Sequence, residues 1–170
     1  GAVAGLCPLT EASLGDGTFD GVRWLGAGGR IAVGSDSNIR IALPEELRQL
    51  ETTQRLRDGS RAALAEDGGS TGRRLWEAAS RGGAQAAGRD AGRIEAGALA
   101  DLVALDGTVT DLDGLSGDRL LDALVFARCE GAVTEVWSAG RHIVSGGRHV
   151  SRDAITARYR EAVRSLRARA

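Results

Sequence analysis

The residues best suited to chemistry follow a short apolar run. Residues 31–34 are apolar or small throughout, which suits a buried strand of a parallel sheet. Four small polar residues come directly after it: Ser35, Asp36, Ser37 and Asn38. The active sites of (β/α)8 barrels lie at the carboxyl ends of the strands, so in such a fold Asp36 would face the mouth of the barrel. In the alternative interpretation, Asp36 and Ser37 form a turn or cap the following helix.

A carboxylate in that position has a defined chemical use. It can bind a divalent metal ion, and it can accept a proton from water that the metal has acidified. A catalytic metal of this kind also needs two or three histidine ligands. The two histidines of the chain, His142 and His149, come late and have no Cys or His at metal-ligand spacing. We therefore expect both to be ordinary surface histidines.

A second polar stretch lies earlier in the chain. Residues 1–7 form another short apolar run, and residues 10–17 are expected to form a polar, glycine-containing loop after it. Such a loop after a barrel strand lies on the catalytic face, where Thr10, Glu11 and Asp16 could contact a substrate. The same three residues would serve equally well as turn and capping residues.

Composition limits the classes of partner. The chain has 170 residues, 42% of them hydrophobic and 26% charged, and a net charge of -1. The near-neutral balance argues against nucleic acid or an acidic membrane surface as a partner, because both require a clustered positive field. No apolar run approaches the roughly 20 residues of a membrane span, and residues 1–9 lack the basic flank and the length expected of a signal peptide. Cys7 and Cys129 are expected to be free thiols, so we expect a cytoplasmic protein.

Apolar spacing predicts the elements that position these residues. Residues 1–36 should form a strand, a loop, a short helix and a parallel strand. A helix should run from Pro44 to about Ala65, and another over residues 72–80, with Gly82 and Gly83 interrupting it. The later part of the chain should form a strand, a helix, a β-hairpin and an amphipathic helix, over residues 100–106, 120–127, 133–145 and 151–167. That last helix should bury a stripe of Ile155, Tyr159, Val163 and Leu166.

Several stretches resemble the amidohydrolase superfamily. Asp36 after a strand resembles its last-strand aspartate. The return from barrel to β-sandwich and the closing hairpin of that superfamily are similar to residues 83–88, 92–106 and 133–141. Within the superfamily, the formimidoylglutamate deiminases resemble this chain most, over residues 5–17, 34–38, 45–51, 54–57 and 117–123.

The resemblance implies an α/β fold. Residues 1–88 would be the C-terminal portion of a (β/α)8 TIM-type barrel, with its last two strands and helices. Residues 89–150 would form part of a small β-sandwich, and residues 151–170 a C-terminal helix. The resemblance also implies a small-molecule substrate, and a homodimer is compatible with it.

The resemblance also implies a reaction, the zinc-dependent hydrolytic deimination of N-formimino-L-glutamate to N-formyl-L-glutamate and ammonia in histidine degradation. Zinc, or another divalent metal, would be the cofactor. Asp36 would bind the metal and shuttle the proton. Its neighbours Ser35, Ser37 and Asn38 would hold the carboxylate and shape the pocket. Thr10 and Glu11 would also line that pocket.

The chain departs from this family in one respect. The histidine ligands and substrate-binding arginines of the family belong to earlier strands, which this sequence does not contain. We therefore expect the 170-residue segment to be inactive alone. Two alternatives remain open: another deaminase of the superfamily, of the guanine or aminopyrimidine type, and a non-catalytic interaction module.

Overall fold

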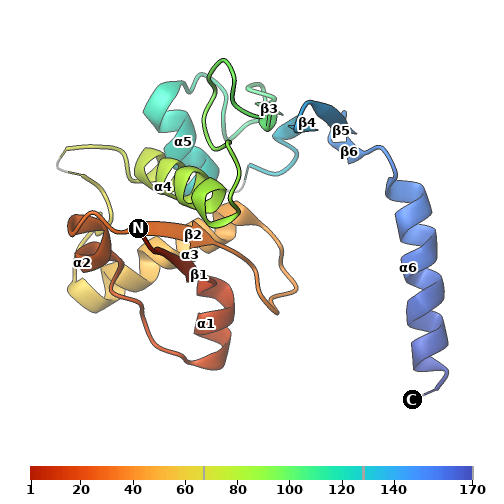
Figure 1. The fold of residues 1–170 in the computed structure, drawn as a ribbon, viewed down its shortest axis with the longest axis horizontal. Coiled ribbons are helices and arrows are strands. Elements are labelled where there is room, and N and C mark those ends of the chain that lie inside the picture. Colours follow the sequence, from red (N-terminus) through yellow and green to blue (C-terminus); the bar gives the residue numbers. More distant parts are fainter. Residues whose placement is uncertain (67, 128, 170) are drawn as a thin grey trace.

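The computed structural model describes residues 1–66, 68–127 and 129–169. In Figure 1, β1 and β2 lie at the centre of a body that they form with α1 to α5, the sheet of β3 to β6 lies beside that body, and α6 stands apart. The elements follow in the order β1 (Val3–Leu6), α1 (Pro8–Leu14), α2 (Gly21–Gly26), β2 (Arg30–Val33), α3 (Leu43–Asp58), α4 (Thr71–Ala86), β3 (Leu102–Leu105), α5 (Gly117–Phe126), β4 (Val133–Ser138), β5 (Arg141–Ser145), β6 (Arg148–His149) and α6 (Arg152–Arg167).

The two early apolar runs form the parallel pair β1 and β2, which confirms the predicted strand–helix–strand unit. Leu6 pairs with Val33, so the two strands end at the same level. The residues that follow them, Cys7 and Gly34, therefore lie at one common edge. This alignment brings the polar stretches after both strands close together.

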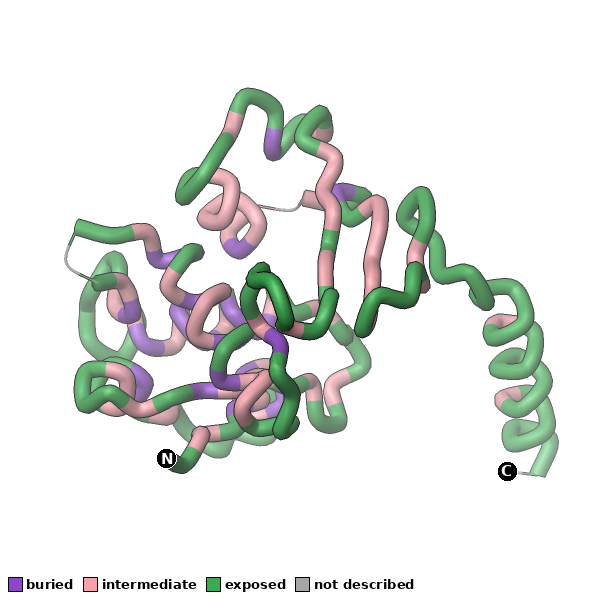
Figure 2. The backbone as a smooth tube through the Cα atoms, turned by 45° about the horizontal axis from the view of Figure 1, so that its top comes forward, coloured by how far each residue is buried: buried purple, intermediate pink, exposed green. Residues whose placement is uncertain are grey.

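Helix α4 covers the strand pair. Helix α5 then packs against α4 and α3. Figure 2 shows the buried residues concentrated in this part of the molecule. The core comprises one buried set of aliphatic side chains, namely Leu6, Ile31, Leu47, Leu50, Leu64, Leu75, Ala79 and Val125. The structure is thus a mixed α/β arrangement built on a small parallel sheet.

Gly82 and Gly83 do not interrupt α4, so the predicted break there is wrong. The helix runs unbroken through both glycines to Ala86. A Cβ atom built on Gly82 would lie 1.8 Å from the carbonyl oxygen of Ile31 in β2. Gly82 therefore lets the helix lie directly on the strand, and this packing outweighs the helix-propensity cost of glycine, about 1 kcal/mol.

Helix α3 ends before the predicted boundary near Ala65. Gly59 takes a left-handed backbone conformation, φ 63°, at its C-terminus. The chain then turns back, and the buried side chain of Glu51 accepts hydrogen bonds from the backbone amides of Ala63 (2.9 Å) and Leu64 (3.0 Å). The turn is therefore held by a side chain within the helix.

The predicted polar loop over residues 10–17 is wrong for residues 10–14, because α1 begins directly at Pro8 and runs to Leu14. Proline suits the first turn of a helix, since its missing N–H needs no partner there. Gly15, with φ 74°, ends the helix. Thr10 and Glu11 are therefore helical residues with fixed directions.

A second, antiparallel sheet has the strand order β3-β4-β5-β6. The predicted strand near residue 103 and the predicted hairpin of β4 and β5 are confirmed. Ala139 and Gly140, which join β4 to β5, both have positive φ angles, as a two-residue hairpin turn requires. The predicted helix over residues 120–127 is confirmed as α5.

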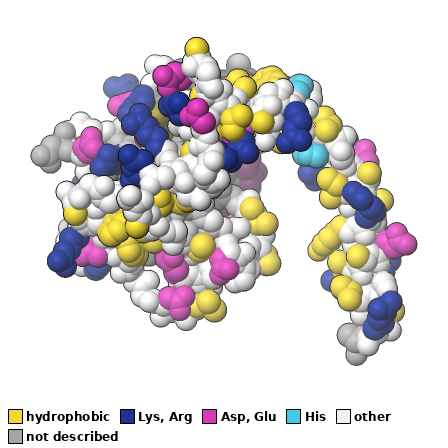
Figure 3. All heavy atoms as spheres, in the orientation of Figure 1, with side chains coloured by type: hydrophobic (Ala, Val, Ile, Leu, Met, Phe, Trp, Pro, Cys, Tyr) yellow, Lys and Arg dark blue, Asp and Glu magenta, His cyan; other side chains and the backbone are white. Residues whose placement is uncertain are grey.

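Helix α6 forms as predicted, but its apolar stripe is not buried. Tyr159 is 68% exposed and Leu166 is 65% exposed. Within the described residues nothing covers this face, and Figure 3 shows the helix with apolar and arginine side chains on a free surface. No helix in the described ranges is both long and apolar enough to cross a membrane.

Candidate active site

Asp36 lies in the turn that follows β2, at the edge where both parallel strands end. Its side chain is exposed and its backbone has a φ of 45°, in the left-handed region. Residues other than glycine adopt this region uncommonly, although Asp and Asn tolerate it best. Such conformations persist only where the surroundings fix them, and they concentrate at functional sites.

The carbonyl oxygen of Ser35 anchors this turn. It accepts one hydrogen bond from the Thr10 hydroxyl of α1 (2.9 Å) and another from the Asn38 backbone amide (2.9 Å). The Asn38 side chain closes the other side of the turn through both of its polar atoms. Its Nδ2 donates to the Arg40 carbonyl (2.9 Å), and its Oδ1 accepts from the Arg40 amide (3.2 Å).

Glu46, in the first turn of α3, is 2% exposed and lies beneath this edge. Its Oε2 accepts a hydrogen bond from the Leu9 amide (2.9 Å), and its Oε1 accepts one from Asn38 Nδ2 (3.4 Å). One buried carboxylate therefore connects the start of α1, after β1, to the turn after β2.

The predicted contact residues divide into two groups. Thr10 is buried and donates to the Ser35 carbonyl, and Glu11 accepts a hydrogen bond from the Cys7 amide (2.7 Å). Both side chains therefore stabilise the backbone of this edge. Ser37 is exposed beside Asp36, with its hydroxyl 3.5 Å from Asp36 Oδ2. The structure brings Thr10, Glu11 and Ser37 to the same edge as Asp36, whereas Asp16 is exposed after the end of α1. Contact of any of these residues with a substrate stays a prediction.

Three carboxylates lie near the Cys7 thiol at this edge, those of Asp36, Glu11 and Glu46. Burial raises the pKa of the Cys7 thiol, and the charges of Asp36, Glu11 and Glu46 raise it further. Charges raise the pKa of a thiol in this way only at short range, so all three carboxylates lie near Cys7. Such a concentration of negative charge favours a cation over an anion at this edge.

A metal ion is the cation that the chemistry of the site suggests. The exposed carboxylate of Asp36 fits the role of one ligand for a divalent metal. Among the described residues, however, no group of three or more His, Cys, Asp and Glu side chains could hold such an ion. His142 lies away from the edge on β5, stacked on Trp137 with ring centroids 4.8 Å apart. The described ranges thus offer one candidate ligand, Asp36, and no complete metal site.

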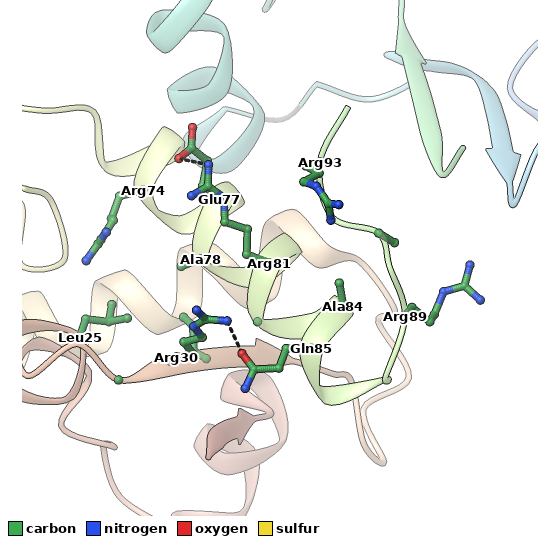
Figure 4. A pocket seen from close by; sticks show the side chains of 14 residues that line it. Leu25, Arg30, Arg74, Glu77, Ala78, Arg81, Ala84, Gln85, Arg89 and Arg93 are labelled. Atoms are coloured by element: carbon green, nitrogen blue, oxygen red, sulfur yellow. Dashed lines mark hydrogen bonds and ion pairs between the residues drawn. The ribbon is translucent and has the colours of Figure 1, made fainter. Parts of the chain in front are cut away.

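A separate cavity of about 650 Å³ lies at the opposite end of β2, between that strand and α4 (Figure 4). Arginines dominate its lining, but they are paired: Arg30 with Gln85, Arg74 with Glu66, Arg81 with Glu77, Arg89 with Asp101, and Arg93 with Asp90 and Glu95. Its position and the pairing of its arginines separate this cavity from the candidate site.

Both cysteines, Cys7 and Cys129, are free, as predicted.

The local sequence does not distinguish Glu46 from its neighbour Glu45, because both are acids in the first turn of α3, where a negative charge is favourable. One signal was available, because Glu46 lies four residues before the buried Leu50 and therefore on the apolar face of α3. A carboxylate on such a face must find hydrogen-bond donors.

Comparison with known proteins gives consistent matches. The model of the amidohydrolase family matches residues 2–143. A protein of Pseudomonas aeruginosa named formimidoylglutamate deiminase is 47% identical over 154 residues, which are 90% of this chain and 34% of that protein. A protein of Natronomonas pharaonis named 5-methylthioadenosine/S-adenosylhomocysteine deaminase is 35% identical over 103 residues, 59% of this chain and 22% of that protein.

Solved structures agree with these matches. A crystal structure of an amidohydrolase from Brucella melitensis superposes with a TM-score of 0.90 at 46% identity, covering 98% of this chain and 36% of that one. An adenosine deaminase from Xanthomonas campestris, solved with bound zinc, superposes with a TM-score of 0.83 at 25% identity, covering 98% and 38%. This chain spans about a third of the length of its 47% identical relative. The family match over residues 2–143 and these relatives show that the chain belongs to the amidohydrolase family.

Proposed function

We propose that this chain is the C-terminal part of a zinc-dependent enzyme that hydrolyses N-formimino-L-glutamate to N-formyl-L-glutamate and ammonia in histidine degradation. The observation that carries the proposal is the exposed Asp36 carboxylate at the common end of two parallel strands. Its support is the 47% identity to the formimidoylglutamate deiminase of Pseudomonas aeruginosa.

The proposal includes an architecture. Strands β1 and β2 would be the last two strands of a (β/α)8 barrel, within a barrel portion of residues 1–88. Residues 89–150 would form part of a β-sandwich, and residues 151–170 a terminal helix. What supports this is the parallel pair with its covering helices, the separate antiparallel sheet, and the superposition on the Brucella melitensis structure.

In this proposal Asp36 would hold zinc, or another divalent metal, as one ligand. When bound, such an ion acidifies water and stabilises developing negative charge. Support comes from the related structure solved with zinc and from the negative charge at this edge. Thr10, Ser35 and Asn38 orient the Asp36 carboxylate through the backbone of its turn.

The chemistry assigns Asp36 a second task. In the overall reaction, the oxygen of water forms a bond to the formimino carbon, the carbon–nitrogen bond breaks, and both water protons leave with the nitrogen as ammonia. The Asp36 carboxylate can hold each proton at one of its oxygens between water and the departing nitrogen. Ser37, 3.5 Å from that carboxylate, lies where it can contact the substrate.

A second candidate function is deamination of an amino group on a ring. The 35% identity to the Natronomonas pharaonis deaminase and the fold match to an adenosine deaminase favour it. Guanine and aminopyrimidines would then be substrates of the same class of reaction. The two candidates share the role of Asp36 and differ in substrate.

The test measures ammonia release by the complete gene product, with N-formimino-L-glutamate, guanine, adenosine and an aminopyrimidine as substrates. We expect turnover of the formimino substrate, and a loss of more than about 100-fold in Asp36→Asn, because losing a ligand should exceed the 10–100-fold effect of losing an outer partner. Asp113→Asn, at an exposed position away from the edge, is the matched control. Parental activity in Asp36→Asn would overturn the catalytic assignment, and exclusive turnover of a ring substrate would replace the formimino assignment.

A further inference from the structure

Two neighbouring glutamates at the start of α3 have different environments. Glu45 lies at the surface and pairs with the exposed Arg40 (2.5 Å). Glu46 is buried and, within the described residues, has no arginine partner. Burial of a carboxylate costs free energy unless hydrogen-bond donors satisfy it. The donors that bond to Glu46 therefore indicate its structural role.

The donors of Glu46 come from the two segments that follow the strands. Leu9 offers a backbone N–H of the first turn of α1, which has no partner inside that helix. Asn38 offers its side-chain amide from the turn of Asp36, two residues further along. Each oxygen of the carboxylate accepts from one segment, so Glu46 fixes one segment relative to the other.

We propose that Glu46 is a positioning residue for Asp36, and that it determines how tightly the site holds its divalent cation. This inference rests on the proposed function of Asp36 as a ligand. Asp36 has an uncommon left-handed backbone, which the surrounding contacts must maintain. Glu46 supplies one of those contacts through Asn38, and its negative charge adds to the field at the edge.

The proposal predicts a specific failure in Glu46→Gln. Glutamine keeps the size of the side chain and can still accept from Leu9. Its NH2 group would then face the NH2 group of Asn38, and two donors cannot bond. Rotating the Asn38 amide would repair that contact but would break both of its bonds to Arg40. The turn of Asp36 therefore loses one anchor in either case.

Glu51 provides a matched control for burial. It is also a buried glutamate of α3 with two backbone or amide donors: it accepts two backbone N–H groups in the turn after that helix. Unlike Glu46, it also pairs with an arginine, Arg55 (2.6 Å). Glu51→Gln should therefore destabilise the fold without affecting the edge at Asp36. Glu45→Gln controls for removing a charge next to Glu46.

The experiment measures zinc affinity by competition with a chelator, together with the unfolding free energy of the metal-free protein, for the complete gene product. We expect Glu46→Gln to lower zinc affinity by about 10–100-fold, the usual effect of removing an outer partner of a ligand. We expect Glu51→Gln and Glu45→Gln to stay within about twofold of the parent. The kcat of Glu46→Gln should fall more than its KM rises, because orientation of Asp36 is lost and substrate contacts are not.

Two further variants keep the outcomes separable. Asn38→Ala removes the same anchor from the other side and should also weaken zinc binding, which keeps the proposal testable if Glu46→Gln fails to fold. Asp36→Asn tests the proposed function itself, and unchanged zinc affinity there would overturn that function. If Asp36→Asn loses zinc while Glu46→Gln matches Glu51→Gln in affinity, only the positioning role is refuted.

Discussion

Gly82 offers the sharpest test of how the sheet is covered. Its Cα lies so close to β2 that an added Cβ would be 1.8 Å from the Ile31 carbonyl oxygen, while real Cβ atoms essentially never come within 3.0 Å of a neighbour. In Gly82→Ala, helix and strand must therefore move apart by about 1.2 Å, the difference between these distances. The obstructing atom belongs to the backbone, so no side-chain rotation relieves the contact.

The expected cost follows from two opposing effects. Overpacking of a core costs typically 1–3 kcal/mol, and a rigid backbone contact belongs at the upper end, about 3 kcal/mol. Alanine in place of glycine gains about 1 kcal/mol of helix propensity. We therefore expect Gly82→Ala to lower the free energy of unfolding by about 2 kcal/mol.

Gly83 is the matched control, because it is the next residue of the same helix and an added Cβ there meets nothing within 4 Å. Gly83→Ala should raise the free energy of unfolding by up to about 1 kcal/mol. Urea unfolding of both variants, followed by circular dichroism, measures the difference of about 3 kcal/mol between them. Equal stability of the two variants would refute the close packing of α4 on β2.

Two further predictions concern acid stability and the core. The backbone amide of Ala139 and the guanidinium of Arg89 lower the pKa of Asp101, so this carboxylate stabilises the fold above its unfolded pKa of about 3.9 and ceases to do so as the pH falls through its folded pKa. Asp101→Asn should therefore lose stability less steeply than the parent below about pH 4 in urea unfolding, and parallel curves would contradict this. Leu75→Ala should cost 2–5 kcal/mol, because Leu75 is fully buried, whereas the 87% exposed Leu56→Ala should change stability by less than about 0.5 kcal/mol; equal effects in thermal unfolding would show that the core is misassigned.

Local sequence patterns were sufficient to predict the elements whose residues are close together in the sequence. Residues 31–34 are apolar and end in polar residues, so β2 and the position of Asp36 after it followed from the sequence. The hairpin of β4 and β5 followed in the same way from alternation and a two-residue turn.

Other features depend on contacts that the local sequence does not contain. Continuity of α4 through Gly82 depends on a strand about 50 residues earlier, and the burial of Glu46 depends on Leu9, 37 residues away. The sequence predicts the apolar stripe of α6 correctly, but the prediction that this stripe is buried is wrong. Burial requires a neighbouring surface, and the described residues provide none.

The left-handed backbone of Asp36 restricts which amino acids can occupy that position. The backbone has a φ of 45°, which glycine, asparagine and aspartate tolerate best, and the metal-binding role proposed for Asp36 would also require a short side chain with negative charge. Asparagine meets the backbone preference alone, and glutamate meets the charge but not the backbone preference. Aspartate satisfies both, so under the proposed function the backbone and the chemistry would favour the same residue. An alanine variant would confound the two effects, whereas asparagine isolates the charge.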